Sequence, residues 1–100
     1  MLGQRRRRWW TTEGLPPLRL LALEHWDPEN VYDDPTRAGI YDPYLERLGR
    51  MLRRGKGPGD VARYLGSVRT KVFRHDPNEA ADELFADQVV AWYSLEAPHD

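Results

Sequence analysis

The sequence predicts an all-α protein, a small single-domain bundle of about four helices with a disordered, arginine-rich N-terminal tail. Three observations support this prediction. Apolar residues recur at helical spacing in three clear stripes along the chain. Asp-Pro steps and glycines separate the stripes, and no stretch alternates with the period of a β-strand. The length of 100 residues, without internal repeats, corresponds to one small domain.

The composition is that of a soluble globular protein and excludes several kinds of chemistry. Hydrophobic residues make up 40% of the sequence, charged residues make up 31%, and the net charge is −1. The chain has no cysteine, which excludes disulfides and thiolate chemistry. Its longest apolar run, Leu20 to Leu23, is far too short to span a bilayer, and no apolar signal segment follows the N-terminal arginines. We therefore expect a cytoplasmic protein.

Residues 1–14 contain four consecutive arginines and show no periodic pattern of burial. Like charges repel each other, so we expect this segment to be a disordered basic tail. In a functional tail, Trp9 and Trp10 would stack on a nucleic acid or insert into an anionic membrane. A terminus without a role, or one produced by an upstream start codon, is the favoured interpretation.

The first helix is expected to begin at Leu15-Pro16-Pro17, because proline in a first helical turn loses no hydrogen bond. It opens a helical domain that should span residues 15–95. One face of this helix is formed by Leu18, Leu21, Ala22 and His25. His25 is expected to be a packed or capping histidine, since no partner histidine or nucleophile lies at a useful spacing.

The stretch 24–44 organises the chain and contains three Asp-Pro steps. Asp27-Pro28 should end the first helix, because a proline disfavours the α region for the residue before it. Asp42-Pro43 should start the second helix, with the aspartate accepting from free backbone N–H groups. The flanking aromatic rings should be partly buried and hold the stretch against the helices. The predicted structural motif consists of Trp26, Asp27, Pro28, Tyr41, Asp42 and Pro43.

An acidic loop is expected over residues 29–40. In an EF-hand counted from Asp27, the positions that require glycine and glutamate hold Tyr32 and Ala38, so no calcium site is predicted. The second helix should run from Pro43 to about Arg54, followed by a glycine in the left-handed conformation. Its apolar stripe consists of Tyr44, Leu45, Leu48, Met51 and Leu52.

Two further helices follow a glycine turn. A third should run from Val61 to about Phe73, with a stripe that includes Val61, Tyr64, Leu65, Val68 and Val72. A fourth should begin with Asp76 as its cap and Pro77 as its first residue. Its buried face is expected to contain Ala81, Leu84, Phe85, Gln88, Val89 and Trp92, with Leu95 closing the core. Residues 96–100 should be frayed.

These parts resemble a known family. The quoted segments are HWDP at the end of the first helix, YDPY opening the next, the LERLGRML stripe, a glycine turn and VARYL. Together they resemble small bacterial proteins of an uncharacterised, all-helical domain family with a WDP-type step and a YD-type helix start. The resemblance covers roughly residues 18–73. It implies a compact helical fold and a cytoplasmic location, and it supplies no activity or catalytic residues.

A rival resemblance concerns residues 60–74. The segment VARYLGSVRTKVFR is similar to the helix-turn-helix units of small DNA-binding regulators, with Gly66 at the turn. In that case Arg69, Thr70, Lys71 and Arg74 would lie on or near a recognition helix. Val68, however, continues the apolar stripe as one uninterrupted helix requires, so a single helix is favoured. Residues 15–100 carry 11 basic and 15 acidic side chains, a net charge of −4, which also disfavours duplex DNA.

No catalytic constellation stands out, and we expect no catalytic residues, cofactor or metal ligands. His25 and Asp27 are only a nominal acid–base pair. Charge is unevenly placed, with six acids between Glu24 and Asp42 and five bases between Arg47 and Lys56. Opposed charges favour steered association with another protein. The leading hypothesis is therefore a non-enzymatic helical protein-interaction module, with nucleic acid as a less favoured partner. The candidate contacts are Asp33, Asp34, Arg47, Arg50 and Arg54.

Overall fold

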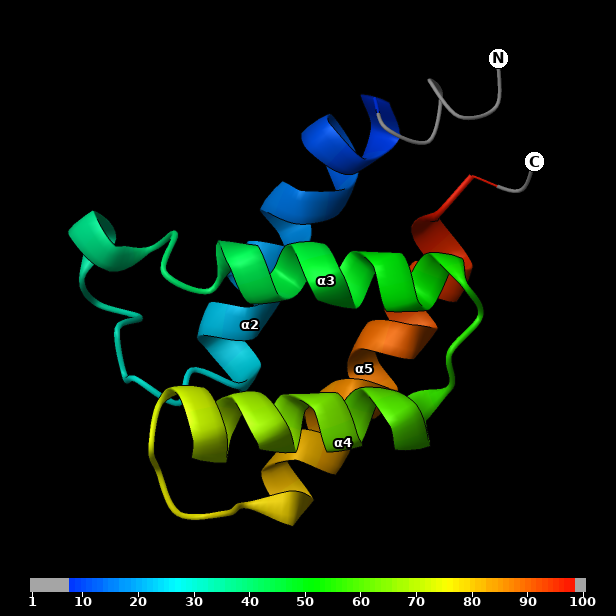
Figure 1. Cartoon of the computed structure of the whole chain (residues 1–100). Helices are drawn as coiled ribbons and strands as arrows, with labels where there is room; N and C mark the ends of the chain where they lie inside the picture. Colours follow the sequence, from blue (N-terminus) through cyan, green and yellow to red (C-terminus); the bar gives the residue numbers. More distant parts are fainter. Residues whose placement is uncertain (1–7, 99–100) are drawn as a thin grey trace.

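The computed structural model describes residues 8–98, and the regular structure among them is entirely helical. This confirms the predicted all-α class. The elements are η1 (Trp10–Gly14), α2 (Leu15–His25), η2 (Pro35–Arg37), α3 (Asp42–Arg53), α4 (Pro58–Ser67), η3 (Val68–Val72) and α5 (Glu79–Glu96). The helices α3 and α4 run side by side in front, and α2 and α5 cross behind them (Figure 1). No helix in the described range is long and apolar enough to cross a membrane.

The apolar stripes of the four α-helices meet in one core. The residues that are almost inaccessible to water come from every main helix and from the loop before α3: Leu18, Ala22, Val31, Tyr41, Leu45, Leu48, Val61, Leu65, Phe85, Ala86 and Val89. Each large side chain of this kind stabilises the fold by about 1.5–3 kcal/mol relative to exposure. The predicted stripes of the first three helices therefore supply much of the core.

The residues predicted to start and end the second helix do so in α3. The chain enters α3 through Asp42-Pro43 and leaves it at Arg54, and Gly55 adopts φ +80°. Glycine tolerates this left-handed angle without a Cβ penalty, so it ends the helix cleanly. The turn then carries the chain back into α4 beside α3 (Figure 1).

The predicted disordered tail over residues 1–14 is wrong for residues 8–14. These residues are helical and run through the π-helical turn η1 directly into α2. The Trp9 ring lies 5.9 Å from the Trp92 ring, and Trp10 Nε1 donates to Glu46 Oε2 at 2.8 Å. Aromatic burial against distant helices fixes this segment. Residues 1–7 lie outside the described range.

The third helix has no turn at Gly66. The helix α4 continues into the π-helical turn η3 through Ser67 and Val68, both in the right-handed helical region. This contradicts the helix-turn-helix geometry proposed for residues 60–74. Arg69, which that hypothesis placed near a recognition helix, is only 8% exposed and is therefore unavailable to DNA.

The fourth helix begins later than predicted, and its buried face matches the prediction only in part, at Phe85 and Val89. Asn78 is its cap and accepts from Ala81 N at 3.2 Å, because its side chain reaches the free N–H three residues on. Leu84 is 61% exposed and Leu95 is 80% exposed, so neither closes the core. The face that is buried consists of Asp82, Phe85, Ala86 and Val89.

The C-terminal end is ordered further than the prediction for residues 96–100. The helix α5 continues to Glu96, and the Ala97 side chain is buried. Residues 99–100 lie outside the described range.

Candidate functional site

The turn after α2 is held together by the Asp27 carboxylate. Asp27 itself adopts φ +34°, which places it outside the right-handed helix. Its carboxylate accepts from Val31 N at 2.9 Å, Tyr32 N at 2.9 Å and the Tyr41 hydroxyl at 2.7 Å. The Tyr41 hydroxyl also accepts from Glu29 N at 2.8 Å. The Asp27 carboxylate and the Tyr41 hydroxyl are thus used to shape the loop, which gives the motif a structural role.

Asp42 connects two helices and does not cap its own. The cap position of α3 belongs to Tyr41, and no side chain accepts a capping hydrogen bond there. Instead, the Asp42 carboxylate accepts from Arg19 Nε at 2.9 Å and Nη2 at 2.7 Å. The predicted capping role is therefore wrong, because a bidentate guanidinium from α2 occupies both oxygens. Pro43 is exposed in the first turn, where its missing N–H has no consequence.

Trp26 is the buried end of a polar cluster that sequence reasoning missed. Its Nε1 donates to Asp82 Oδ1 at 2.9 Å, and its ring stacks on Phe85 at 5.8 Å. Asp82 also pairs with Arg69, whose Nη2 lies 3.0 Å from Oδ1. Asp82 and Arg69 are 3% and 8% exposed. A signal existed, because Asp82 precedes Phe85, Ala86 and Val89 by helical spacings, and a charge on a buried face requires a partner.

The two acidic candidates lie apart from the basic ones. Asp34 caps the short helix η2, accepting from Thr36 N at 3.1 Å and Thr36 Oγ1 at 2.6 Å. Asp33 is exposed in the same loop, which projects beyond the N-terminal end of α3 (Figure 1). The predicted arginines lie further along α3, toward its C-terminal end. The five predicted contacts therefore do not form one surface.

The predicted arginines Arg47, Arg50 and Arg54 do meet in a groove between α3 and α4. We call it the basic groove; its volume is about 520 Å³, and it is lined by Arg47, Arg50, Met51, Arg54, Lys56 and Tyr64. The Arg47 guanidinium lies 5.7 Å from the centroid of the Tyr64 ring. The Tyr64 hydroxyl donates to Tyr44 O at 2.8 Å, so this ring is held from two sides.

The cations of the basic groove, Arg47, Arg50, Arg54 and Lys56, form no ion pair with any acidic side chain that the structure describes. All four are exposed. Burial of Tyr64 raises the pKa of its hydroxyl to about 12, although nearby Arg47 lowers it. None of the described residues that line the groove is acidic. The negative end of the α3 dipole favours cations near its C-terminus and so explains why some of these side chains are basic. It leaves their N–H donors free to bind a partner.

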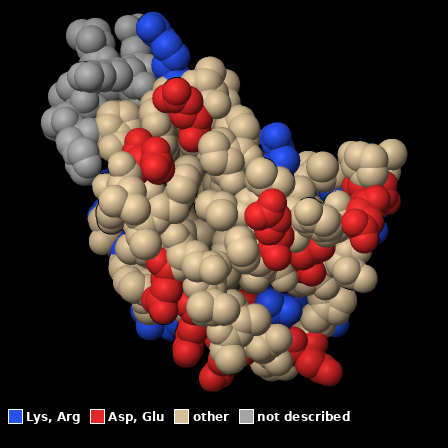
Figure 2. Space-filling model, turned by 180° about the vertical axis from the view of Figure 1, so that it is seen from behind, with Lys and Arg blue, Asp and Glu red and all other residues tan. Residues whose placement is uncertain are grey.

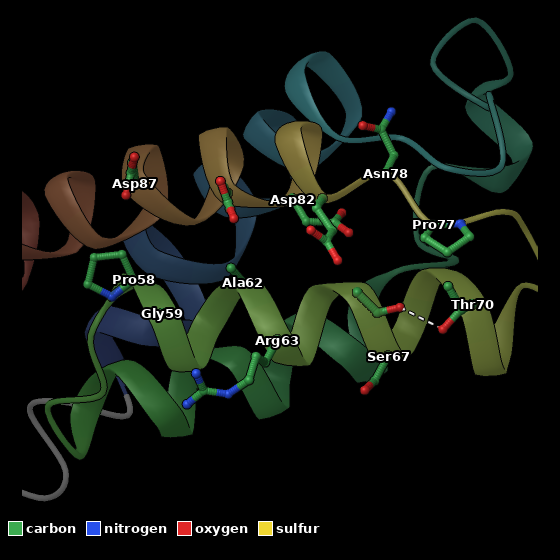
Figure 3. A pocket seen from close by; sticks show the side chains of 13 residues that line it. Pro58, Gly59, Ala62, Arg63, Ser67, Thr70, Pro77, Asn78, Asp82 and Asp87 are labelled. Carbon is green, nitrogen blue, oxygen red and sulfur yellow. Dashed lines mark hydrogen bonds between the residues drawn. The ribbon is translucent and has the colours of Figure 1, made fainter.

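A second, larger groove lies between α4 and α5. Its volume is about 760 Å³, and small residues of α4 such as Gly59 and Ala62 face acidic residues of α5 such as Asp87 (Figure 3). Asp82 lines it too, but its carboxylate already holds Arg69. From behind, acidic side chains predominate over basic ones (Figure 2). The described acidic side chains of this groove are therefore either exposed to water or, at Asp82, already paired, so the groove presents no buried, unpaired group to a ligand.

Comparisons with protein-family models, curated proteins and solved structures gave no match. The resemblance to a bacterial helical family therefore stays a prediction.

The nominal acid–base pair, His25 and Asp27, does not have the geometry of one. His25 is exposed rather than packed, and its Nε2 lies 3.7 Å from Glu24 Oε2. No hydrogen bond joins it to Asp27, whose carboxylate is occupied within its own turn. No group of three or more potential metal-ligating side chains of the types His, Cys, Asp and Glu occurs in the described part of the chain.

Proposed function

We propose that the protein is a non-enzymatic helical interaction module that binds an acidic segment of another protein in the basic groove. The observation that carries this proposal is the set of four exposed cations around one groove, none of them paired with an acid in residues 8–98. In ion pairs elsewhere, such as Arg19–Asp42, the two charges compensate each other within the fold. The groove cations remain available to a partner.

The electrostatics of the groove favour binding with a fast association rate and modest affinity. Like charges gathered on one surface attract an acidic partner over distances up to a Debye length. Each exposed ion pair adds only about 0.2–1 kcal/mol, so several must form together. A bacterial and cytoplasmic setting, expected from the sequence, belongs to the same proposal.

The experiment is a fluorescence-anisotropy titration with a labelled peptide rich in glutamate. Reversing Arg47 and Arg54 together (R47E/R54E) should weaken binding at least about tenfold, because two attractive contacts become repulsive. The matched control is Arg53→Glu, which makes the same charge change on α3 outside the groove. Equal binding by the wild type, the double variant and the control would remove the proposal.

A further inference from the structure

The arginines of the basic groove repeat at the spacing of one helix face. Arg47 and Arg50 lie on α3 and Arg54 is the C-cap that follows its last residue; the three are spaced by three and four positions, and all three are exposed. Residues at these intervals are neighbours on a helix surface, and the row extends about 10 Å along the axis. A partner helix with acidic side chains at the same intervals would place one carboxylate opposite each guanidinium.

Beside the charges, the groove has an apolar wall that is already in place. Met51 and Tyr64 are half-buried and pack against the core, one from each helix. The Tyr64 ring cannot swing away, because Arg47 covers it and its hydroxyl is bonded to Tyr44 O. Methionine adapts its shape to an incoming side chain. The groove can therefore hold one apolar side chain between the acidic contacts.

The aromatic content of the groove and the charge around it disfavour a single-stranded nucleic acid as the partner. Binding of that kind relies on bases stacking on exposed aromatic rings along a cationic track. Tyr64 is the only aromatic side chain among the described residues that line the groove, so the groove offers a single ring and no row of rings for successive bases. Outside the groove the described residues are net acidic, since residues 8–98 carry 15 acidic side chains and, apart from the four groove cations, 8 basic ones. A polyanion longer than the groove would meet this repulsion.

We infer that the partner segment is an amphipathic α-helix, with acidic residues at positions i, i+3 and i+7 and one apolar residue among them. This inference rests on the proposed function and names its partner. The helix lies along the groove between α3 and α4, its carboxylates on the arginine row and its apolar residue on Met51 and Tyr64. Such helix-in-groove docking is a recurring mode of peptide recognition.

The experiment compares three labelled probes by anisotropy at physiological salt. The first is a helix-favouring peptide with glutamates at i, i+3 and i+7 and one leucine beside them. The second has the same composition in an order that spreads the glutamates around the helix. The third is a single-stranded oligothymidylate of equal charge. We expect the first peptide to bind at least about tenfold more tightly than the second, with a gain of helicity in circular dichroism.

The outcomes separate the inference from the function on which it rests. Equal binding of both peptides, weakened by R47E/R54E, would overturn the helix inference and leave the proposed function standing. Binding of the oligonucleotide in preference to both peptides, or of no probe at all, would overturn the proposed function as well.

A double-mutant cycle tests the apolar contact separately. Met51→Ala should weaken binding of the leucine peptide about fivefold and leave a peptide with alanine at that position almost unaffected. Additive effects of the two substitutions would show that the side chains do not touch, which contradicts the inferred placement. A thermal melt of the Met51→Ala variant verifies that it is folded at the titration temperature.

Discussion

The indole of Trp10 lies so close to Gly49 that a Cβ added at Gly49 would stand 2.6 Å from Trp10 Cη2. Gly49 is buried in the middle of α3, and the same indole donates to Glu46 one turn earlier. The absence of a side chain at Gly49 therefore creates the space in which η1 is anchored. An N-terminal segment that carries no apolar stripe of its own becomes part of the fold through this contact.

Gly49→Ala should destabilise the protein. The new methyl group meets a rigid ring at 2.6–2.9 Å, so Trp10 must move and lose its hydrogen bond to Glu46. We expect a net loss of about 1–3 kcal/mol, even though alanine is intrinsically the better helix former. Urea denaturation followed by circular dichroism measures the change. A variant as stable as the wild type would show that Trp10 is not packed against α3.

Gly66→Ala is the matched comparison, with the opposite expectation. Its added Cβ would lie 3.5 Å from Asp82 Oδ2, an ordinary contact, and Gly66 is helical. Stability should stay unchanged or rise by up to about 1 kcal/mol, because alanine reduces the freedom of the unfolded chain. A clear loss in the same denaturation assay would point instead to a strained turn at this position.

The buried Arg69–Asp82 pair should be costly to break. Asp82→Ala leaves the Arg69 guanidinium and the Trp26 N–H without their acceptor in a site that is nearly inaccessible to water. The expected loss is about 3–5 kcal/mol. Removing one partner of the exposed Arg63–Asp60 pair by Arg63→Ala should cost about 1 kcal/mol or less. Similar losses for both variants would contradict the difference in burial.

Stability should fall at alkaline pH. Burial, and then the hydrogen bond to Asp27, raises the pKa of Tyr41, and burial raises the pKa of Tyr64 to about 12. An unfolded tyrosine titrates near pH 10. The raised folded pKa therefore contributes stability that is complete below about pH 10 and is lost as the pH rises toward 12 and beyond.

Urea denaturation between pH 8 and about pH 12 measures this effect. Tyr64→Phe should flatten the alkaline decline, because it removes one of the two groups that must ionise. A decline of the same steepness in that variant would assign the effect to other residues.

Helix positions could be predicted from the sequence wherever local chemistry decides them. Pro43 and Gly55 act within one turn of their own position, and the stripes that run through Leu45 and Val61 are periodic. The start of α5 is not predictable in this way, because Asp76 and Asn78 are both favourable cap residues and the structure uses Asn78.

Long-range contacts could not be predicted in this way. The partner of Trp10 is a glycine 39 residues away, which has no side chain to signal the contact. Asp82 meets Trp26 across 56 positions of sequence. The arginines at positions 47, 50 and 54 were recognised from their shared face, whereas Tyr64 joins them only because α4 folds back beside α3.

The most direct measurement of the proposed docking surface is a titration of isotope-labelled protein with the glutamate-register peptide, followed by amide NMR shifts. The shifts should cluster at residues 47–56 and at Tyr64, and they should shrink in R47E/R54E but persist in Arg53→Glu. Shifts centred on the groove between α4 and α5, around Asp82 and Asp87, would contradict the assignment of the basic groove as the binding surface.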